Sequence, residues 1–119
     1  MDIRIQSWLF DILQCIDEIF LFLGEKRDFK TYLADIKTKK AVERNLEIIG
    51  EAVYRILKAD GNFQLENAKN IIGTRNRIIH SYDNISDEII WTIVCRELPD
   101  LKVQVENLLN NNKSTDHSN

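Results

Sequence analysis

The sequence predicts an all-α protein, a bundle of four long helices with additional short ones. Glycine and proline are scarce, with four and one in 119 residues, whereas an all-β fold needs many turns. Apolar residues recur at helical spacing over long stretches, and no alternating strand pattern stands out. A chain of this length forms one domain that buries roughly two-thirds of its unfolded surface. We therefore expect a helical domain over residues 1–109, followed by a polar, flexible tail over residues 110–119.

A first helix is predicted over residues 2–23, with Gly24 as its C-terminal stop. Its main stripe advances by alternating steps of four and three residues: Ile5, Leu9, Ile12, Ile16, Ile19 and Leu23. A second apolar line repeats every seven residues beside the first: Trp8, Cys15 and Phe22. A helix with two stripes has two packing partners. One can be a neighbouring helix and the other a second copy of the chain, so we expect a homodimer.

Further helices are predicted after Gly24. A short one over residues 27–36, with Asp28 as a candidate cap, should share one apolar face among Phe29, Leu33 and Ile36. A long one over residues 38–59 carries a regular stripe: Val42, Leu46, Ile49, Val53 and Ile56. A third spans residues 64–79. Ser86 should cap the next helix, and Pro99 either kinks it or starts a further one.

Composition and charge exclude several classes of function. The net charge is −3, from 16 basic and 19 acidic residues, so binding to nucleic acid over the whole surface is not expected, although a local basic patch remains open. Residues 1–24 are apolar but interrupted by five charged side chains, which argues against a membrane span. They also lack the order of a signal peptide. We expect a cytoplasmic protein without membrane contact.

No metal or cofactor is expected. Cys15 and Cys95 lie far apart in no metal-like spacing, which indicates two buried, reduced thiols. The predicted domain has one histidine, His80, because His117 falls in the polar tail. One histidine and two scattered cysteines cannot form an ordinary zinc site, and the sequence has no glycine loop of the kind that cradles phosphates.

The stretch from Arg75 to Tyr82 is the most distinctive part of the sequence. It reads Arg-Asn-Arg-Ile-Ile-His-Ser-Tyr, and no acidic residue occurs from Asn67 through Tyr82. A histidine transfers protons near neutral pH, and an arginine makes forked hydrogen bonds to phosphate. The combination predicts a site for an anion, with a phosphodiester as the first candidate. Taken singly, each side chain is more often a helix cap, a packing residue or part of a solvated face.

Helix geometry places these side chains differently. Asn76 precedes His80 by four residues and can orient the imidazole, while Arg77 precedes it by three, on a neighbouring row. Arg75 lies about 140° around an ideal helix from His80. The two converge only if the helix ends or distorts before His80, or if the arginine side chain reaches around. A break predicted at residues 82–84 favours an early end.

The order of the motif residues supports a family resemblance. Arg75, four residues, His80, one residue and Tyr82 reproduce an R-x4-H-x-Y signature. In this the chain resembles the HepT-like toxins, which belong to the HEPN superfamily of small helical ribonucleases. The superfamily prefers a small polar residue directly after the arginine, and Asn76 supplies it.

Three flanking segments extend the resemblance over residues 1–109. Segment 43–52 resembles the family's helix before the motif helix, segment 71–77 its lead-in, and segment 98–101 its last-helix break. The resemblance implies a HEPN-like four-helix up-and-down bundle that dimerises, with the motifs of two subunits facing one cleft.

The resemblance also implies a metal-independent endoribonuclease that acts on RNA as a toxin. Arg75 would stabilise charge on the phosphorus oxygens and His80 would move protons, with Asn76 and Arg77 in support. The partner would be a small nucleotidyltransferase antitoxin that attaches AMP to the motif tyrosine, here Tyr82, and so silences the nuclease.

Two questions stay open in the sequence. Glu51 lies in segment 43–52 and either reaches Arg75 from the neighbouring helix or is a plain surface glutamate. The chain is either a ribonuclease or a non-catalytic nucleotide-binding companion of a nucleotidyltransferase, in which Tyr82 is only a contact or a modification site. The intact pair of Arg75 and His80 favours the ribonuclease.

Overall fold

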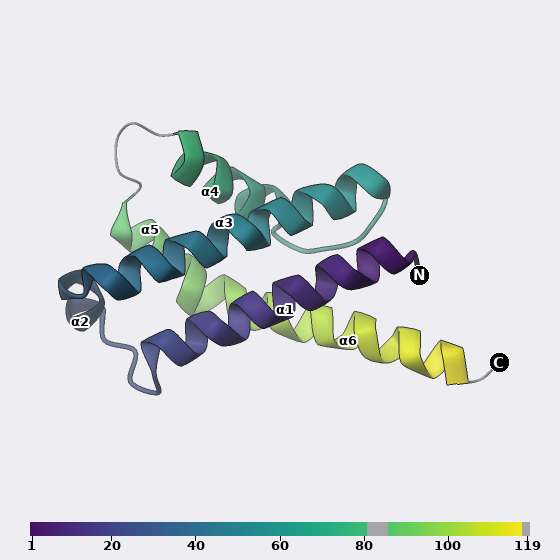
Figure 1. The fold of residues 1–119 in the computed structure, drawn as a ribbon, viewed down its shortest axis with the longest axis horizontal. Helices are drawn as coiled ribbons and strands as arrows, with labels where there is room; N and C mark the ends of the chain where they lie inside the picture. The colour runs from purple at the N-terminus through teal and green to yellow at the C-terminus, as the bar shows by residue number, and fades with distance from the viewer. Residues whose placement is uncertain (81–85, 118–119) are drawn as a thin grey trace.

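The chain folds as an up-and-down helical bundle, shown in Figure 1. The computed structural model describes residues 1–80 and 86–117, with residues 112–117 described by their backbone alone. These residues form α1 (Ile3–Leu23), α2 (Phe29–Ala34), α3 (Ile36–Ala59), α4 (Ala68–His80), α5 (Asp87–Thr92), the π-helical turn η1 (Ile93–Glu97) and α6 (Leu98–His117), without a strand. The last three elements run on as one rod.

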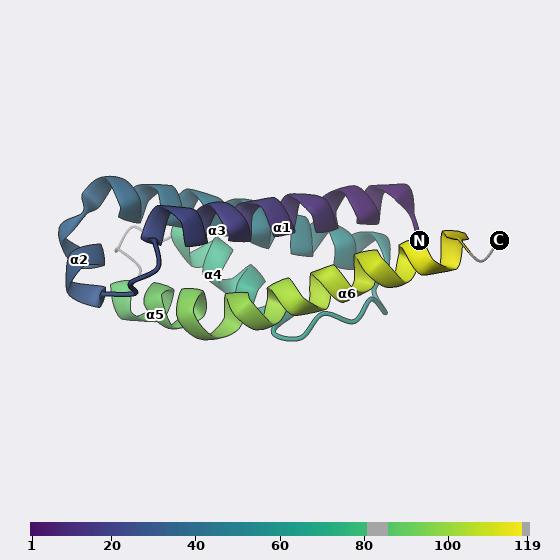
Figure 2. The ribbon, with the colours of Figure 1, turned by 90° about the horizontal axis from the view of Figure 1, so that it is seen from below.

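The four rods alternate in direction, and α2 closes one end of the bundle (Figure 1). Figure 2 shows α1 and α3 on one side and the rod of α5 and α6 on the other. The predicted all-α fold with four long helices is therefore confirmed. No helix in the described part of the chain combines the length and the hydropathy of a membrane-spanning segment.

The two predicted stripes of α1 and α3 form the centre of the core. On α1 the residues at steps of four and three are buried from Ile5 to Ile19, and on α3 they are buried from Val42 to Ile56. The third wall comes from the rod of α5 and α6: Ile90, Val94, Leu98, Leu101 and Val105. Burial of this apolar surface is the dominant force that holds the rods together.

The second apolar line of α1 packs largely within its own chain. Cys15 is buried, and Trp8 is half-buried against the core. The buried amide of Asn45 on α3 donates from Nδ2 to the Cys15 carbonyl at 3.3 Å and to Glu18 Oε1 at 3.0 Å. Only Phe22 of this line is exposed, at 42%. The line therefore does not form a free dimer surface, and dimerisation stays a prediction that it no longer supports.

The short helix buries a different face from the predicted one. Leu33 and Ile36 are 39% and 70% exposed, whereas Tyr32 is buried. The Tyr32 ring packs against Trp91 with the ring centroids 5.1 Å apart. The reason is that Asp35 ends α2 and begins α3, where its carboxylate accepts a hydrogen bond from the Thr38 amide at 3.1 Å. Ile36 thus belongs to a new helix and leaves the predicted face.

Helix α4 starts four residues later than predicted, at Ala68 instead of residue 64. Asn67 has a φ of 61°, a left-handed conformation that asparagine tolerates and a right-handed helix excludes. Before it, Leu65 is buried, and the Glu66 amide donates to Gln104 Oε1 at 2.9 Å. This anchored turn replaces the first helical turn that the apolar spacing suggests.

Pro99 is accommodated by the π-helical turn directly before it. The Leu98 N–H bonds to the Ile93 carbonyl, five residues back, and this wider turn makes room for a proline that has no N–H and would clash with an ordinary preceding turn. The helix then continues to His117 through the predicted tail. The flexibility of residues 110–119, and the division between domain and tail, stay predictions.

Candidate functional site

Arg75 lies where α4 crosses α3, directly over Gly50. A Cβ atom at Gly50 would lie 2.2 Å from Arg75 Cβ and 2.8 Å from Arg75 Cγ, closer than such atoms approach in proteins. The two helices can meet this closely only because Gly50 has no side chain. Sequence reasoning included Gly50 in the resemblance but missed this role. The available signal was a glycine in the middle of a strongly periodic helix, which usually has a packing reason.

Glu51 holds the Arg75 side chain from the neighbouring helix. Glu51 Oε2 lies 2.6 Å from Arg75 Nη2 in a close ion pair. The other carboxylate oxygen, Oε1, accepts a hydrogen bond from Arg55 Nε at 3.0 Å. The Glu51 and Arg75 side chains are 33% and 24% exposed, so water screens the pair less than it screens a surface ion pair. Of the two alternatives for Glu51, the structure shows contact with Arg75.

Asn76 also contacts Arg75. Its Oδ1 accepts a hydrogen bond from Arg75 Nη1 at 2.8 Å. The contact that helix spacing predicts, between Asn76 and His80, is absent from the described part of the chain. Arg77 is exposed. Arg75 thus has Glu51 and Asn76 as partners, and these fix the direction of its guanidinium.

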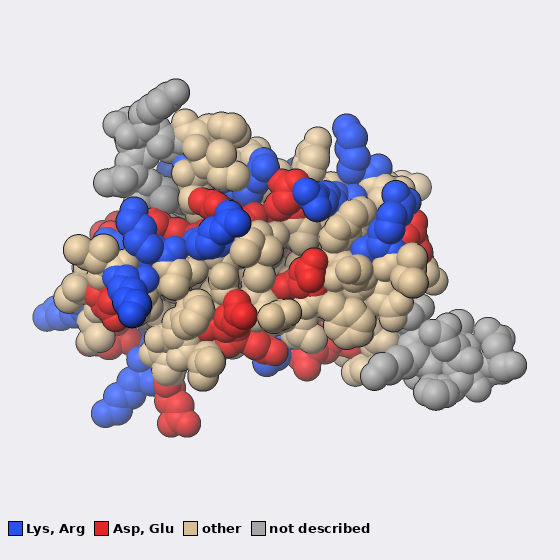
Figure 3. Space-filling view, viewed as in Figure 1, with Lys and Arg blue, Asp and Glu red and all other residues tan. Residues whose placement is uncertain are grey.

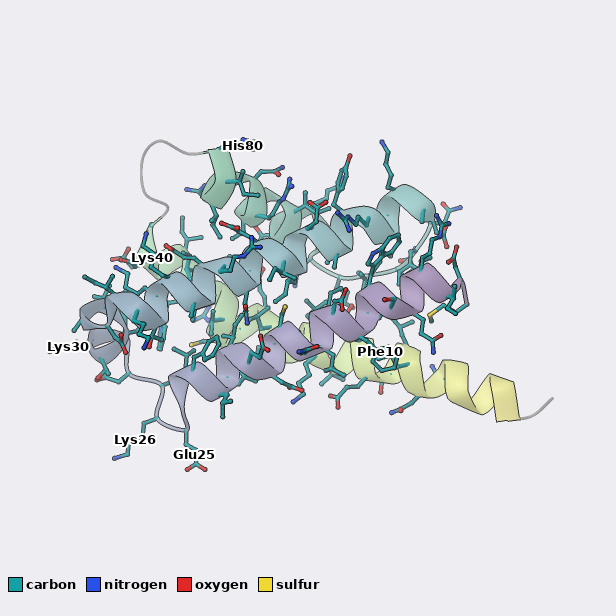
Figure 4. The ribbon with its side chains drawn as sticks, viewed as in Figure 1. Phe10, Glu25, Lys26, Lys30, Lys40 and His80 are labelled. Carbon is teal, nitrogen blue, oxygen red and sulfur yellow. The ribbon has the colours of Figure 1, made fainter. Side chains whose placement is uncertain are left out.

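His80 is the last residue of α4 and is exposed. Figure 4 places it at the outer end of the helix. The helix stays regular through His80, so the predicted early end is not found. Arg75 faces α1 and α3, whereas His80 lies outside the cavity that Arg75 lines. One chain therefore does not bring the two side chains together. Tyr82 lies outside the described residues.

A cavity of about 250 Å³ opens beside Arg75 where α1, α3 and α4 meet. Its charged walls contain three arginines and three carboxylates: Arg44, Arg55, Arg75, Asp11, Glu47 and Glu51. Its apolar walls come from Trp8, Ile48, Ala52 and Ile79. Figure 3 shows acidic and basic side chains intermingled on this face. The mixture suits a ligand that carries both negative charge and hydrogen-bond donors.

Among residues 1–80 and 86–117, no three histidine, cysteine, aspartate or glutamate side chains lie so that they could hold one metal ion together, the three carboxylates of the cavity included. The two cysteines are free, with Cys15 buried and Cys95 half-buried. Burial raises the pKa of the Cys15 thiol to about 11, helped by the charge of Glu18. Such a thiol is almost entirely protonated near neutral pH and is a poor nucleophile.

Comparison with known proteins identifies related sequences. A family model described as ribonuclease HepT-like matches residues 12–108. A protein of Methanocaldococcus jannaschii, named as a candidate RNase, is 33% identical over 115 residues, or 96% of this chain and 94% of its own. A protein of Thermococcus cleftensis, named as a candidate ribonuclease HepT, is 34% identical and covers 87% of this chain and 94% of its own. No solved structure gives a match.

Proposed function

This chain belongs to the HepT-like ribonuclease family, and from that membership we propose that it cuts RNA at a metal-independent site built around Arg75 and His80. The enzyme class, a ribonuclease, agrees with the sequence-based prediction. The observation that carries the proposal is the arrangement of α4, which holds the Arg75 guanidinium with Glu51 and leaves the His80 imidazole exposed at the helix end.

RNA carries its own nucleophile, the 2′-hydroxyl, so the protein must move protons and stabilise negative charge. We assign proton transfer to His80, a contribution worth roughly 10²–10⁴-fold in rate. We assign charge stabilisation to Arg75, in the manner of oxyanion-hole donors whose loss costs about 10²–10³-fold. Asn76 and Glu51 are positioning residues, because both contact the Arg75 guanidinium. Arg77 is a supporting phosphate contact.

The separation of Arg75 and His80 supports a site shared by two subunits. Both lie on one regular helix, about 140° apart, and a homodimer can bring Arg75 of one chain opposite His80 of its partner. Ile79, on the same helix as both residues, is 43% exposed and offers apolar surface for such an association.

RNA cleavage by matched variants tests the catalytic assignments. We expect His80→Ala to lose roughly 10²–10⁴-fold of the initial rate and Arg75→Ala about 10²–10³-fold, with EDTA leaving the wild type active. His117→Ala and Arg96→Ala are the matched controls and should cut RNA at the wild-type rate. Unchanged cleavage by His80→Ala would refute the assignment. Nucleotide binding without cleavage by the wild type would favour the non-catalytic alternative.

The proposed biological role is that of a toxin with a nucleotidyltransferase antitoxin. Incubation with a nucleotidyltransferase encoded beside this chain, together with ATP, should add one AMP group at Tyr82 and stop RNA cleavage, because the adduct adds bulk and negative charge. Tyr82→Phe should escape the modification, and Tyr54→Phe, the matched control at a tyrosine on α3 that is exposed, should not. Mass spectrometry checks both. Modification that persists in Tyr82→Phe would contradict the proposed switch.

A further inference from the structure

The cavity beside Arg75 has the size and the lining chemistry of a nucleobase site. We propose that it holds a base of the RNA strand next to the phosphodiester that Arg75 contacts, and that it prefers guanine to uracil. The inference rests on the proposed ribonuclease function and specifies which part of the substrate this side of the site recognises. At about 250 Å³ the cavity falls just below the usual range for drug-sized ligands, which suits one base with its ribose outside.

Trp8 provides a flat wall for stacking. The side chain is half-buried, packs against the core and lines the cavity. Bases stack on such aromatic faces, and removal of the ring typically weakens binding roughly 5- to 150-fold per base. The second tryptophan, Trp91, packs instead against Phe29 and Tyr32, with ring centroids 5.6 and 5.1 Å away. Fluorescence changes at the two indoles can therefore be separated by substitution.

The charged walls do not favour a simple anion. Three guanidinium groups face three carboxylates, so the charges cancel and a free phosphate ion gains little net attraction. Two of the arginines lie at the rim, because the side chains of Arg44 and Arg55 are 70% and 56% exposed. These can contact the phosphates that flank a base, while the carboxylates can accept hydrogen bonds from the base itself.

Of the three carboxylates, Asp11 is the one whose oxygens are available to accept hydrogen bonds from a ligand. Glu47 accepts from Arg44 at 3.0 Å, and Glu51 is held by Arg55 and Arg75. Asp11 has neither a hydrogen bond nor an ion pair within residues 1–80 and 86–111. An ionised carboxylate only accepts. Guanine presents two adjacent N–H donors on its pairing edge, and uracil presents one. Two bonds to one carboxylate correspond to a preference of roughly 5- to 150-fold.

Binding of 2′-O-methyl oligonucleotides tests the cavity without cleavage, because these lack the attacking hydroxyl. A uridine tetranucleotide is compared with the same strand carrying one guanosine, by anisotropy and by tryptophan fluorescence. The guanosine strand should bind roughly 5- to 150-fold more tightly than the uridine strand. It should quench the tryptophan fluorescence both in the wild type and in Trp91→Phe, where Trp8 is the remaining indole. Asp11→Asn should remove the preference for guanosine. Glu25→Gln should keep it, because Glu25 is exposed and lies beyond the end of α1, away from α4, in Figure 4. Trp8→Ala should weaken both strands.

Several outcomes would overturn the nucleobase site. These are equal affinity for the two strands, quenching that disappears in Trp91→Phe, full competition by inorganic phosphate, and fluorescence that changes with protein concentration but not with oligonucleotide. The last would show that a second copy covers the cavity. Failure of this inference differs from failure of the proposed function: RNA cleavage with equal strand affinities rejects the base site alone. An Asp11-dependent preference without cleavage rejects the nuclease alone.

Discussion

Among single residues, Gly50 has the most direct control over the position of Arg75. The space where its side chain would be is filled by Arg75 itself, so any added atom must push α3 and α4 apart. Gly73, in the middle of α4, provides the opposite case, because a Cβ built there meets no described atom within 4 Å apart from its chain neighbours and the backbone of its own helix. Substitution of each glycine therefore tests a different effect: packing against Arg75 at Gly50, and helix propensity at Gly73.

We expect Gly50→Ala to lower the free energy of unfolding by about 1–3 kcal/mol. It should also reduce RNA cleavage by an amount that approaches the loss in Arg75→Ala, since the guanidinium is displaced. Gly73→Ala should raise the free energy of unfolding by up to about 1 kcal/mol and leave cleavage intact. Urea denaturation and initial rates measure both. A Gly50→Ala protein with the wild-type rate would show that Arg75 does not depend on this contact.

The sequence predicts which residues form the candidate site better than it predicts their contacts. The motif spacing identifies Arg75 and His80, but helix phase alone pairs Asn76 with His80. In the structure Asn76 instead accepts a hydrogen bond from the adjacent Arg75, whose guanidinium also pairs with Glu51 on α3. The contact of Glu51 with Arg75 depends on how closely two helices cross. That distance is set by Gly50 and is not contained in the periodicity of either helix.

At the scale of elements, long apolar stripes are predicted well and short segments are not. The stripes of α1 and α3 hold because many residues of one period bury one face. The short α2 misleads, since three aromatic rings at the end of the bundle decide its orientation more than its spacing does. The π-helical turn before Pro99 is not predicted, because a proline at this position can either kink a helix or begin a new one.

The contact between α1 and α3 includes a buried polar link that can be tested. Asn45→Ala removes the two hydrogen bonds from Nδ2 and leaves the Cys15 carbonyl without that donor. We expect a loss of about 1–3 kcal/mol in the free energy of unfolding. Asn62→Ala, in the exposed turn after α3, should cost less. Urea denaturation compares the two, and an unchanged midpoint for Asn45→Ala would mean that the link contributes nothing to stability.

At the scale of the whole molecule, the open question is how many chains make one site. The bundle measures 52 × 31 × 19 Å and presents Arg75 and His80 to different surroundings. A two-fold dimer would place two copies of α4 against each other, so that each composite site draws one side chain from each chain. This arrangement makes a prediction that a single-chain site does not share.

Mixing two inactive variants tests the composite site. Arg75→Ala and His80→Ala proteins that exchange subunits form heterodimers with one complete site, so the mixture should recover about a quarter of the wild-type rate. Each variant mixed with itself is the control. Sedimentation should show a dimer at micromolar concentration. No recovery despite confirmed exchange would place both residues of a site on one chain, and a monomer would exclude the shared site altogether.

The close approach of Gly50 and Arg75 also bears on how related genes are interpreted. A search for the arginine, histidine and tyrosine of the motif would count as a nuclease any chain that has those three residues at the right spacing. The packing adds a fourth requirement from a different helix, namely that no side chain occupies the position of Gly50. A relative with an intact motif and a bulkier residue at that position would be expected to have lost its nuclease while keeping its fold.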